Sequence, residues 1–392
     1  MSVNIREPFD FLGDPVLMTK VASRETTRLL ALQALRTMAA TMVVLLHAQE
    51  LIGLHAAAHG HAFTHFKAIP LGAGVDLFFV ISGFVVVYAS QKLFCSPGGR
   101  AEFVRRRLIR IIPLYWTALT LRLAVLAVGA GVGAKLFPDA TAIVTSYLFI
   151  PYDSLGFGSD YPFPILDLGW TLNYEMFFYA LFACFMGFRR DVAVPAAVAC
   201  LVGGVLIAAV FPPENLAIRF WLHPISVEFA AGAVIALLFI HGLALNCVMR
   251  IALILGGFAL WLVPVAWFGD TSGPGFYTWI RVMVWGLGAV MIIAGAALGH
   301  TSFKSAWSRA IADLGDSSYA LYLLHPFVFL IFKAVLGKIE LPQVAYWPSV
   351  LLITALAIAA AALFHKYAET PVVAFLREKT RPRASVPAVG VG

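Results

Sequence analysis

Long apolar runs separated by short polar segments dominate the 392 residues of this chain. The runs are about 20 residues long, the length that a helix needs to cross a bilayer core of about 30 Å. They lie at roughly 31–54, 69–91, 111–135, 166–187, 193–212, 220–241, 250–268, 276–298, 317–337 and 348–371. Such runs are too long and continuous for the strands of a membrane barrel. We therefore predict an all-α fold, a polytopic bundle of about ten transmembrane helices.

The composition supports this prediction and narrows the partners. Hydrophobic residues make up 61% of the chain and charged residues 12%, against about 25% charged residues in ordinary globular domains. The net charge of +7 does not indicate nucleic acid, because the basic residues cluster between the apolar runs. The four cysteines have no paired spacing and are interpreted as apolar filler. The lipid bilayer is the expected partner, and no soluble domain is expected.

The distribution of Lys and Arg predicts the orientation of the bundle. Basic residues are frequent in the N-terminal arm, in segment 92–110 and in the C-terminal tail, as in cytoplasmic loops. We expect an uncleaved cytoplasmic arm at 1–30, a membrane domain at 31–372 and a cytoplasmic tail at 373–392. The fragment 140–150 is too short to cross and is expected to be re-entrant or interfacial. Lys333 and Lys338 are exceptions on the outer side, where they can extend to the headgroups.

Two polar side chains stand out in the first apolar run. Arg36 and His47 lie eleven residues apart, which returns to the same helix face within about 20° after a rise of about 16 Å. Charges inside a membrane span are costly and are typical of functional sites. The pair therefore predicts a hydrophilic lane along the first helix. The alternative, an Arg36 that extends to the interface and a His47 at the opposite interface, is equally open.

The second run, "GAGVDLFFVISGF" (72–84), carries Asp76 among small residues and Ser82. A buried carboxylate requires a cation, and Arg36 or His47 is the expected partner. A purely structural ion pair is the alternative. Small residues at this density also favour close packing of helices.

Further candidates come from three later segments. In "RRRLIRIIPLYW" (105–116), Arg107 and Arg110 share a helix face and can bind phosphates. The alternative is that these arginines only set the orientation of the helix in the membrane and bind no ligand. In "LDLGWTLNYEMFFY" (166–179), Trp170 and Glu175 suit recognition of a sugar or hydroxyl, with an ion pair to another intramembrane arginine as the alternative. "DSSYALYLLHPF" (316–327) adds two further polar groups to the ninth run, Tyr319 and His325.

The loop "HAAAHGHAFTH" (55–65) holds four histidines at spacings that can bind zinc. No cysteine or acidic ligand lies close by in the loop. We therefore predict no metal site and interpret the loop as lying at headgroup level or facing an outer substrate.

Together these segments resemble the membrane-bound acyltransferase-3 family, the bacterial O-acyltransferases of surface polysaccharides. The matching strings, in order, are "LQALRTMAATMVVLLHA", "GAGVDLFFVISGF", "RRRLIRIIPLYW", "GWTLNYEMFFY", "EFAAGAVIA", "SSYALYLLHPF" and "YAETP". The resemblance extends over residues 32 to 371. It implies transfer of an acyl group, usually acetyl, from cytoplasmic acyl-CoA to a carbohydrate hydroxyl at the bacterial inner membrane. The donor is a substrate, and no permanently bound cofactor is implied.

The resemblance also assigns residues. Arg36 and His47 match the essential pair of the family, Arg107 and Arg110 match its second arginine pair, and Glu175 matches its conserved acid. The string "WTLNYE" keeps the Trp and the Glu of the family pattern and differs between them, so the middle positions are left unassigned. The acceptor fits exopolysaccharide, lipopolysaccharide or a lipid-linked carbohydrate equally well.

We expect His47 to act as the general base. An imidazole has an intrinsic pKa near about 6.5, so it can take the proton of a sugar hydroxyl that attacks a thioester. Asp76 or Glu175 is expected to orient His47. An acyl-His47 intermediate is a second route that the sequence does not separate from direct transfer.

The donor is expected to lie along the arginines. Arg107 and Arg110 would hold its phosphates at the inner mouth, and Arg36 would hold the donor more deeply or stabilise the thioester oxyanion. Ser82, Trp170, Tyr319 and His325 are expected to support or contact the acceptor. A different class, a secondary transporter or flippase for a glycolipid or anion, uses similar intramembrane charges, but no inverted repeat is visible in the sequence.

Overall fold

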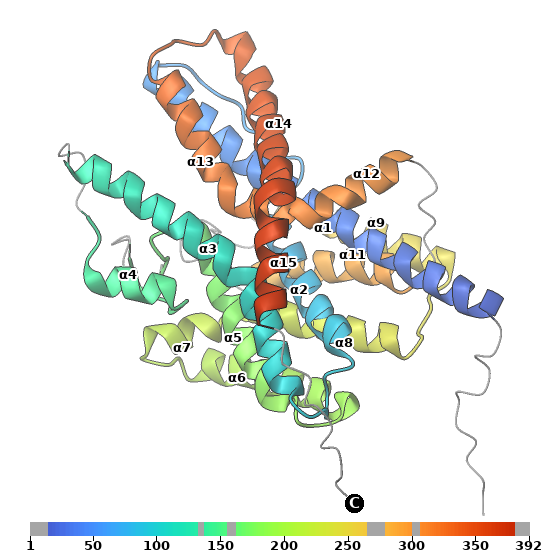
Figure 1. The fold of residues 1–392 in the computed structure, drawn as a ribbon. Helices are drawn as coiled ribbons and strands as arrows, with labels where there is room; N and C mark the ends of the chain where they lie inside the picture. The colour runs from blue at the N-terminus through green and yellow to red at the C-terminus, as the bar shows by residue number, and fades with distance from the viewer. Residues whose placement is uncertain (1–14, 132–136, 155–161, 265–278, 300–305, 381–392) are drawn as a thin grey trace, which may run out of the picture.

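The structure is a computed structural model, and it describes residues 15–131, 137–154, 162–264, 279–299 and 306–380. These residues form helices and contain no β-strand (Figure 1). The helices are α1 Pro15–Ala58, α2 Gly74–Ser90, α3 Gly99–Gly131, α4 Ala140–Tyr147, α5 Trp170–Phe185, α6 Arg190–Val210, α7 Leu216–Trp221, α8 Val227–Ile240, α9 Cys247–Trp261, α10 Trp279–Arg281, α11 Leu287–Ala297, α12 Ala306–Leu314, α13 Ser318–Leu336, α14 Tyr346–Phe364 and α15 Thr370–Lys379. The predicted all-α class is confirmed.

The helix lengths support a multi-pass membrane protein. Within the described ranges, seven helical stretches are long and apolar enough to cross a bilayer, and α8 and α9 are apolar but shorter. Their outward side chains include many exposed leucines and isoleucines, such as Leu351 and Ile207, which is the surface that lipid requires. The finer count of about ten crossings stays a prediction.

The ends of the predicted membrane domain differ from the helix limits. Helix α1 begins at Pro15, inside the predicted arm, and α15 runs from Thr370 into the predicted tail. Residues 1–14 of the predicted arm, 381–392 of the predicted tail and 265–278 between two predicted helices lie outside the described residues. The fragment 140–150 contains α4, an eight-residue helix that is too short to cross and is capped by the Asp139 side chain, which accepts from the Ala142 N–H at 2.7 Å.

Helices α2 and α8 pack backbone against backbone at the centre of the core. A Cβ atom on Gly83 would lie 2.1 Å from the carbonyl oxygen of Phe229, and one on Gly232 would lie 1.9 Å from that of Val80. Only glycine, whose side chain is a hydrogen atom, allows the two backbones to come this close. Small residues commonly have this role between membrane helices. The contact fixes α2 as the central helix against which the site is built.

Helices α13 and α14 stand beside the C-terminal half of α1 (Figure 1). Helix α13 runs in the same direction as α1, because its first residue Ser318 lines the same cavity as Arg36 while its later residue His325 stacks on His47. The two parallel helices therefore present their polar side chains at matching depths.

Candidate active site

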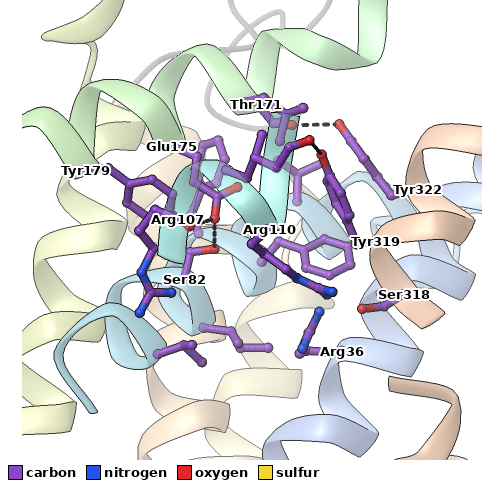
Figure 2. A pocket seen from close by; sticks show the side chains of 17 residues that line it. Arg36, Ser82, Arg107, Arg110, Thr171, Glu175, Tyr179, Ser318, Tyr319 and Tyr322 are labelled. Carbon is purple, nitrogen blue, oxygen red and sulfur yellow. Dashed lines mark hydrogen bonds between the residues drawn. The ribbon is translucent and has the colours of Figure 1, made fainter. Parts of the chain in front are cut away.

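A polar cavity of about 130 Å³ lies between α1, α2, α3, α5 and α13, and we call it the inner cavity. One water needs only ~10–15 Å³, so the cavity has room for several waters or a small organic group. Its polar lining is Arg36, Ser82, Arg107, Arg110, Thr171, Glu175, Tyr179, Ser318, Tyr319 and Tyr322 (Figure 2). Among these are three guanidinium groups and one carboxylate, which favours an anionic ligand.

The Arg107 guanidinium packs against two aromatic rings, and not all of its N–H donors have a hydrogen-bond partner among the described residues. Its guanidinium lies 5.5 Å from the ring centroids of Phe103 and Tyr179. Its Nη2 donates weakly to the Ser90 hydroxyl at 3.4 Å, and its buried Nε has no hydrogen-bond partner among the described residues. A buried donor without a partner is costly, and here it borders a cavity that an acceptor atom can enter.

Arg110 is fixed from two sides and points toward Arg36 (Figure 2). Its Nη1 lies 2.8 Å from Oε1 of the buried Glu369, and its guanidinium lies 5.4 Å from the Tyr319 ring centroid. Arg36 donates to Gln33 Oε1 at 3.2 Å. Two facing cations repel each other in a site of low dielectric, so a ligand that carries negative charge would relieve the repulsion.

Glu175 forms hydrogen bonds with hydroxyl groups. It accepts from Ser82 Oγ at 3.2 Å and from the Tyr179 hydroxyl (Figure 2). The ion pair to an intramembrane arginine considered in the sequence analysis is not formed with Arg281, which pairs with Asp76 instead. Tyr179 follows Glu175 by one helical turn, a spacing that the string "NYEMFFY" already contains.

A larger groove of about 1020 Å³ opens beside the inner cavity, and we call it the basic groove. It shares Val85, Arg107 and Arg110 with the inner cavity and adds three further arginines, Arg105, Arg106 and Arg377. Glu102 accepts from the side chains of Arg105 at 2.7 Å and Arg106 at 2.5 Å, which orders them on the wall. A groove of this size accommodates a drug-sized or nucleotide-sized ligand.

His47 lies in a third space of about 370 Å³, the outer cavity. Its titratable lining is His47, Glu50, Arg122, Asp167, His325 and Lys333. His47 Nδ1 lies 2.9 Å from Glu50 Oε2. Because an ionised carboxylate only accepts, Nδ1 carries the proton and Nε2 of the neutral ring has the lone pair. This is the arrangement that prepares an imidazole to act as a base.

His325 forms the buried face behind His47. The two rings stack with centroids 5.4 Å apart, and His325 is 1% exposed. Its Nδ1 lies 3.0 Å from the carbonyl oxygen of Leu321, so Nδ1 donates and fixes the tautomer. His325 therefore packs against His47 on the buried side, and the role expected of it toward the acceptor stays a prediction.

A thin polar layer separates the inner cavity from the outer cavity. The Thr171 hydroxyl donates to the Tyr322 hydroxyl oxygen at 3.1 Å (Figure 2). The Tyr322 hydroxyl donates in turn to the carbonyl oxygen of Leu168 at 3.1 Å. Tyr322 and Thr171 line the inner cavity, whereas Leu168 lines the outer one. We call these three residues the tyrosine layer. Arg36 and His47 thus do not line one continuous lane: each lies in its own cavity.

The partner predicted for Asp76 was wrong. Asp76 is 0% exposed, and its Oδ2 lies 2.7 Å from Nη2 of Arg281, which is 2% exposed. Arg281 lies just before a π-helical segment, Val282–Gly286, far along the chain, and sequence distance concealed the contact. The expected role of Asp76 or Glu175 as the orienting acid of His47 was also wrong, because Glu50 occupies Nδ1.

Trp170 lies in the core and lines neither cavity. Its ring contacts Phe79 and Tyr174 edge to face, with centroids 6.0 Å apart in both cases. It can position the start of α5, with Thr171 and Glu175, but it does not reach a ligand in these cavities. Ser82 and Tyr319 do line the inner cavity, where Tyr319 donates to the carbonyl oxygen of Ile111 at 2.8 Å.

Several residues of the site were missed in the sequence. Glu50 stands three residues after His47 and on the same face, so helical spacing contained the signal. Arg122, Asp167 and Lys333 come from three separate elements, and only the fold brings them to the outer cavity. Of the loop histidines, His61 contacts the Tyr346 hydroxyl through Nδ1 at 2.8 Å.

Comparison with known proteins identifies the family of this chain. The family model described as "Acyltransferase domain", acyltransferase-3, matches residues 29–366. The chain is 32% identical over 277 residues to the "Exopolysaccharide production protein ExoZ" of Rhizobium meliloti (strain 1021), with 68% of this chain and 78% of that protein covered. No solved structure matches the chain significantly.

Proposed function

Because this chain belongs to the membrane-bound acyltransferase-3 family and is an acyltransferase, we propose that it moves an acyl group, most simply acetyl, from cytoplasmic acyl-CoA to a hydroxyl of a cell-surface or lipid-linked carbohydrate. The similarity to an exopolysaccharide production protein supports a polysaccharide acceptor. We propose the bacterial inner membrane as its location. One observation supports the proposal most directly. The arginine-lined inner cavity and the His47–Glu50 pair of the outer cavity lie on the two sides of the tyrosine layer.

The donor is proposed to enter through the basic groove. Its phosphates would contact the arginines of the groove wall, and its thioester arm would extend past Arg107 and Arg110 into the inner cavity. The two spaces share these arginines. Arg36 faces Arg110 at the far side of the inner cavity (Figure 2), where a guanidinium can stabilise the oxyanion that develops on the thioester carbonyl.

The acceptor is proposed to enter the outer cavity. A sugar hydroxyl attacks the thioester carbonyl, His47 Nε2 takes the hydroxyl proton, and the CoA thiolate leaves and is protonated to the thiol. The Glu50 carboxylate stabilises the imidazolium that forms between these steps. In the alternative route, Nε2 itself accepts the acyl group first and passes it to the hydroxyl. Both routes need a local displacement of the Tyr322 hydroxyl, since the tyrosine layer lies between donor and acceptor.

The helix directions support about ten crossings with both termini in the cytoplasm. Helix α13 is the sixth of the seven long stretches, yet it runs parallel to α1, which requires an odd number of additional crossings between them. Crossing by α5, α8 and α9 supplies three. The basic groove then faces the cytoplasm, in agreement with the excess of arginines there.

The test is a set of His47 and arginine variants. His47→Gln is expected to abolish acyl transfer, read as the O-acyl content of surface glycans by NMR. Arg107→Lys and Arg110→Lys are expected to weaken acetyl-CoA binding to the purified protein about tenfold each, because an ammonium cannot replace a bidentate fork. Arg189→Lys, at an exposed position outside the groove, is the matched control. Normal glycan acylation in His47→Gln would overturn the assignment of the outer cavity as the reaction site.

A further inference from the structure

The outer cavity contains two cations that have no partner in the part of the chain that the structure describes. Of its two carboxylates, Glu50 accepts from His47, and Asp167 accepts from the N–H of Leu168 at 3.0 Å. Arg122 and Lys333 form no ion pair or hydrogen bond with any described residue. Each acid of this cavity thus has a hydrogen-bond donor within the protein, whereas neither cation has an acceptor among the described residues.

Arg122 places a positive charge inside a long apolar helix. It lies in α3, about three turns beyond Arg110, and it is half-buried beside the apolar Val125 and Leu166 of the cavity wall. A guanidinium inside a membrane span is costly unless it is paired or faces a polar cavity. Its planar fork matches the two oxygens of a carboxylate or a phosphate.

Lys333 points to the same cavity from the other side. It lies in the last turn of α13, two turns beyond His325 on the same face, with Phe329 between them. Lys333 and Lys338 are also the cations that break the positive-inside pattern. Of these two, only Lys333 lines the cavity. Lys333 is exposed near the end of its helix and contributes to the cavity lining, so its ammonium is accessible to a ligand there.

We propose that the outer cavity binds an acceptor glycan through an oxyanion, a carboxylate or a phosphate, held by Arg122 and Lys333 beside His47. This rests on the proposed function, because it treats the outer cavity as the acceptor site. A sugar acid of the repeat unit and the diphosphate of a lipid carrier present the same oxygens. Binding of the oxyanion positions a neighbouring hydroxyl at the imidazole, so charge selects the acceptor while His47 performs the chemistry.

The test measures binding to the full-length protein in an uncharged detergent. The probes are an oligosaccharide containing hexuronate, the same oligosaccharide after reduction of its carboxyl groups, farnesyl diphosphate, and phosphatidylglycerol as a competitor. The wild-type protein is expected to bind at least one anionic probe about tenfold more tightly than the reduced oligosaccharide. Arg122→Gln and Lys333→Gln are each expected to remove most of that preference. Lys338→Gln is the matched control.

The outcomes separate the sources and the two proposals. Preference for the uronate indicates a sugar acid, and preference for the diphosphate indicates a lipid carrier. Equal binding of charged and reduced probes, unchanged binding in both Gln variants, or full displacement by phosphatidylglycerol would overturn the inference. Acetyl-CoA binding in the same variants checks that they fold. Anion selectivity in a protein that acylates no glycan would refute the proposed function and leave the anion site standing.

Discussion

The contact between His47 and Glu50 gives the sharpest prediction. Replacing Glu50 with Gln keeps the size of the side chain and removes the charge that stabilises the imidazolium. The side chains of His47 and Glu50 are 33% and 54% exposed, so water screens part of the interaction. A charge-assisted bond at this exposure contributes about 1–2 kcal/mol, which corresponds to a loss of about 5- to 30-fold in kcat/KM.

The size of this loss distinguishes the outer cavity from a buried triad. Replacing the carboxylate of a fully buried serine-protease triad by an amide costs about 10⁴-fold in kcat, because the amide holds the histidine in the wrong tautomer. The assay is transfer of radiolabelled acetyl from acetyl-CoA to isolated acceptor glycan in proteoliposomes. Glu340→Gln, an exposed acid that does not line the outer cavity, is the control and is expected to behave as wild type.

Two results would refute this reasoning. Wild-type kcat/KM in Glu50→Gln, together with an inactive His47→Gln, would show that the imidazole works without its carboxylate. A loss greater than about 10³-fold would show that Glu50 is desolvated during the reaction, and that the outer cavity closes around the acceptor.

Three further changes test the fold and the layer. Asp76→Asn removes the carboxylate that pairs with the buried Arg281, at a cost of about 3–5 kcal/mol; we expect reduced thermal stability in fluorescence-detected gel filtration, and a stable but inactive protein would contradict the structural role. Gly83→Ala is expected to lower the stability of the fold by about 1–3 kcal/mol, because the added methyl group forces α2 away from α8. The same assay measures this loss. Gly203→Ala is the control and should be neutral, because open space surrounds that position. Tyr322→Phe removes a hydrogen bond worth about 1 kcal/mol, so release of CoA without acceptor should rise about fivefold; an unchanged rate would show that the hydroxyl is not a barrier.

Local patterns in the sequence predicted the fold class and the position of the arginines well. The apolar runs coincide with helices, and the i,i+3 spacing of Arg107 and Arg110 was enough to place both on one wall. These features depend on residues within a few turns of each other. The all-helical class follows from the same local reasoning, because a bilayer leaves the backbone few alternatives.

Partners that are distant in the chain were not predictable in this way. Asp76 pairs with Arg281, 205 positions later, and periodicity carries no information on which helix lies opposite. Helix geometry was enough to predict that Arg36 and His47 lie on one face of α1 at different depths. The tyrosine layer between their cavities was not predictable, because its side chains come from two other helices, α13 and α5. Glu50 is a different case, since its i,i+3 spacing from His47 on one helix face is a local signal that the sequence contains.

The tyrosine layer has a consequence for the cell as well as for the reaction. A protein with water-filled spaces on both sides of a bilayer would let protons leak if those spaces joined. The hydrogen bonds of the Tyr322 hydroxyl to Leu168 and Thr171 close the path with one side chain. If the two cavities open to opposite sides of the bilayer, as the proposed topology requires, displacement of the Tyr322 ring would be the step that joins them, and the ring in its present place would limit proton leakage between turnovers.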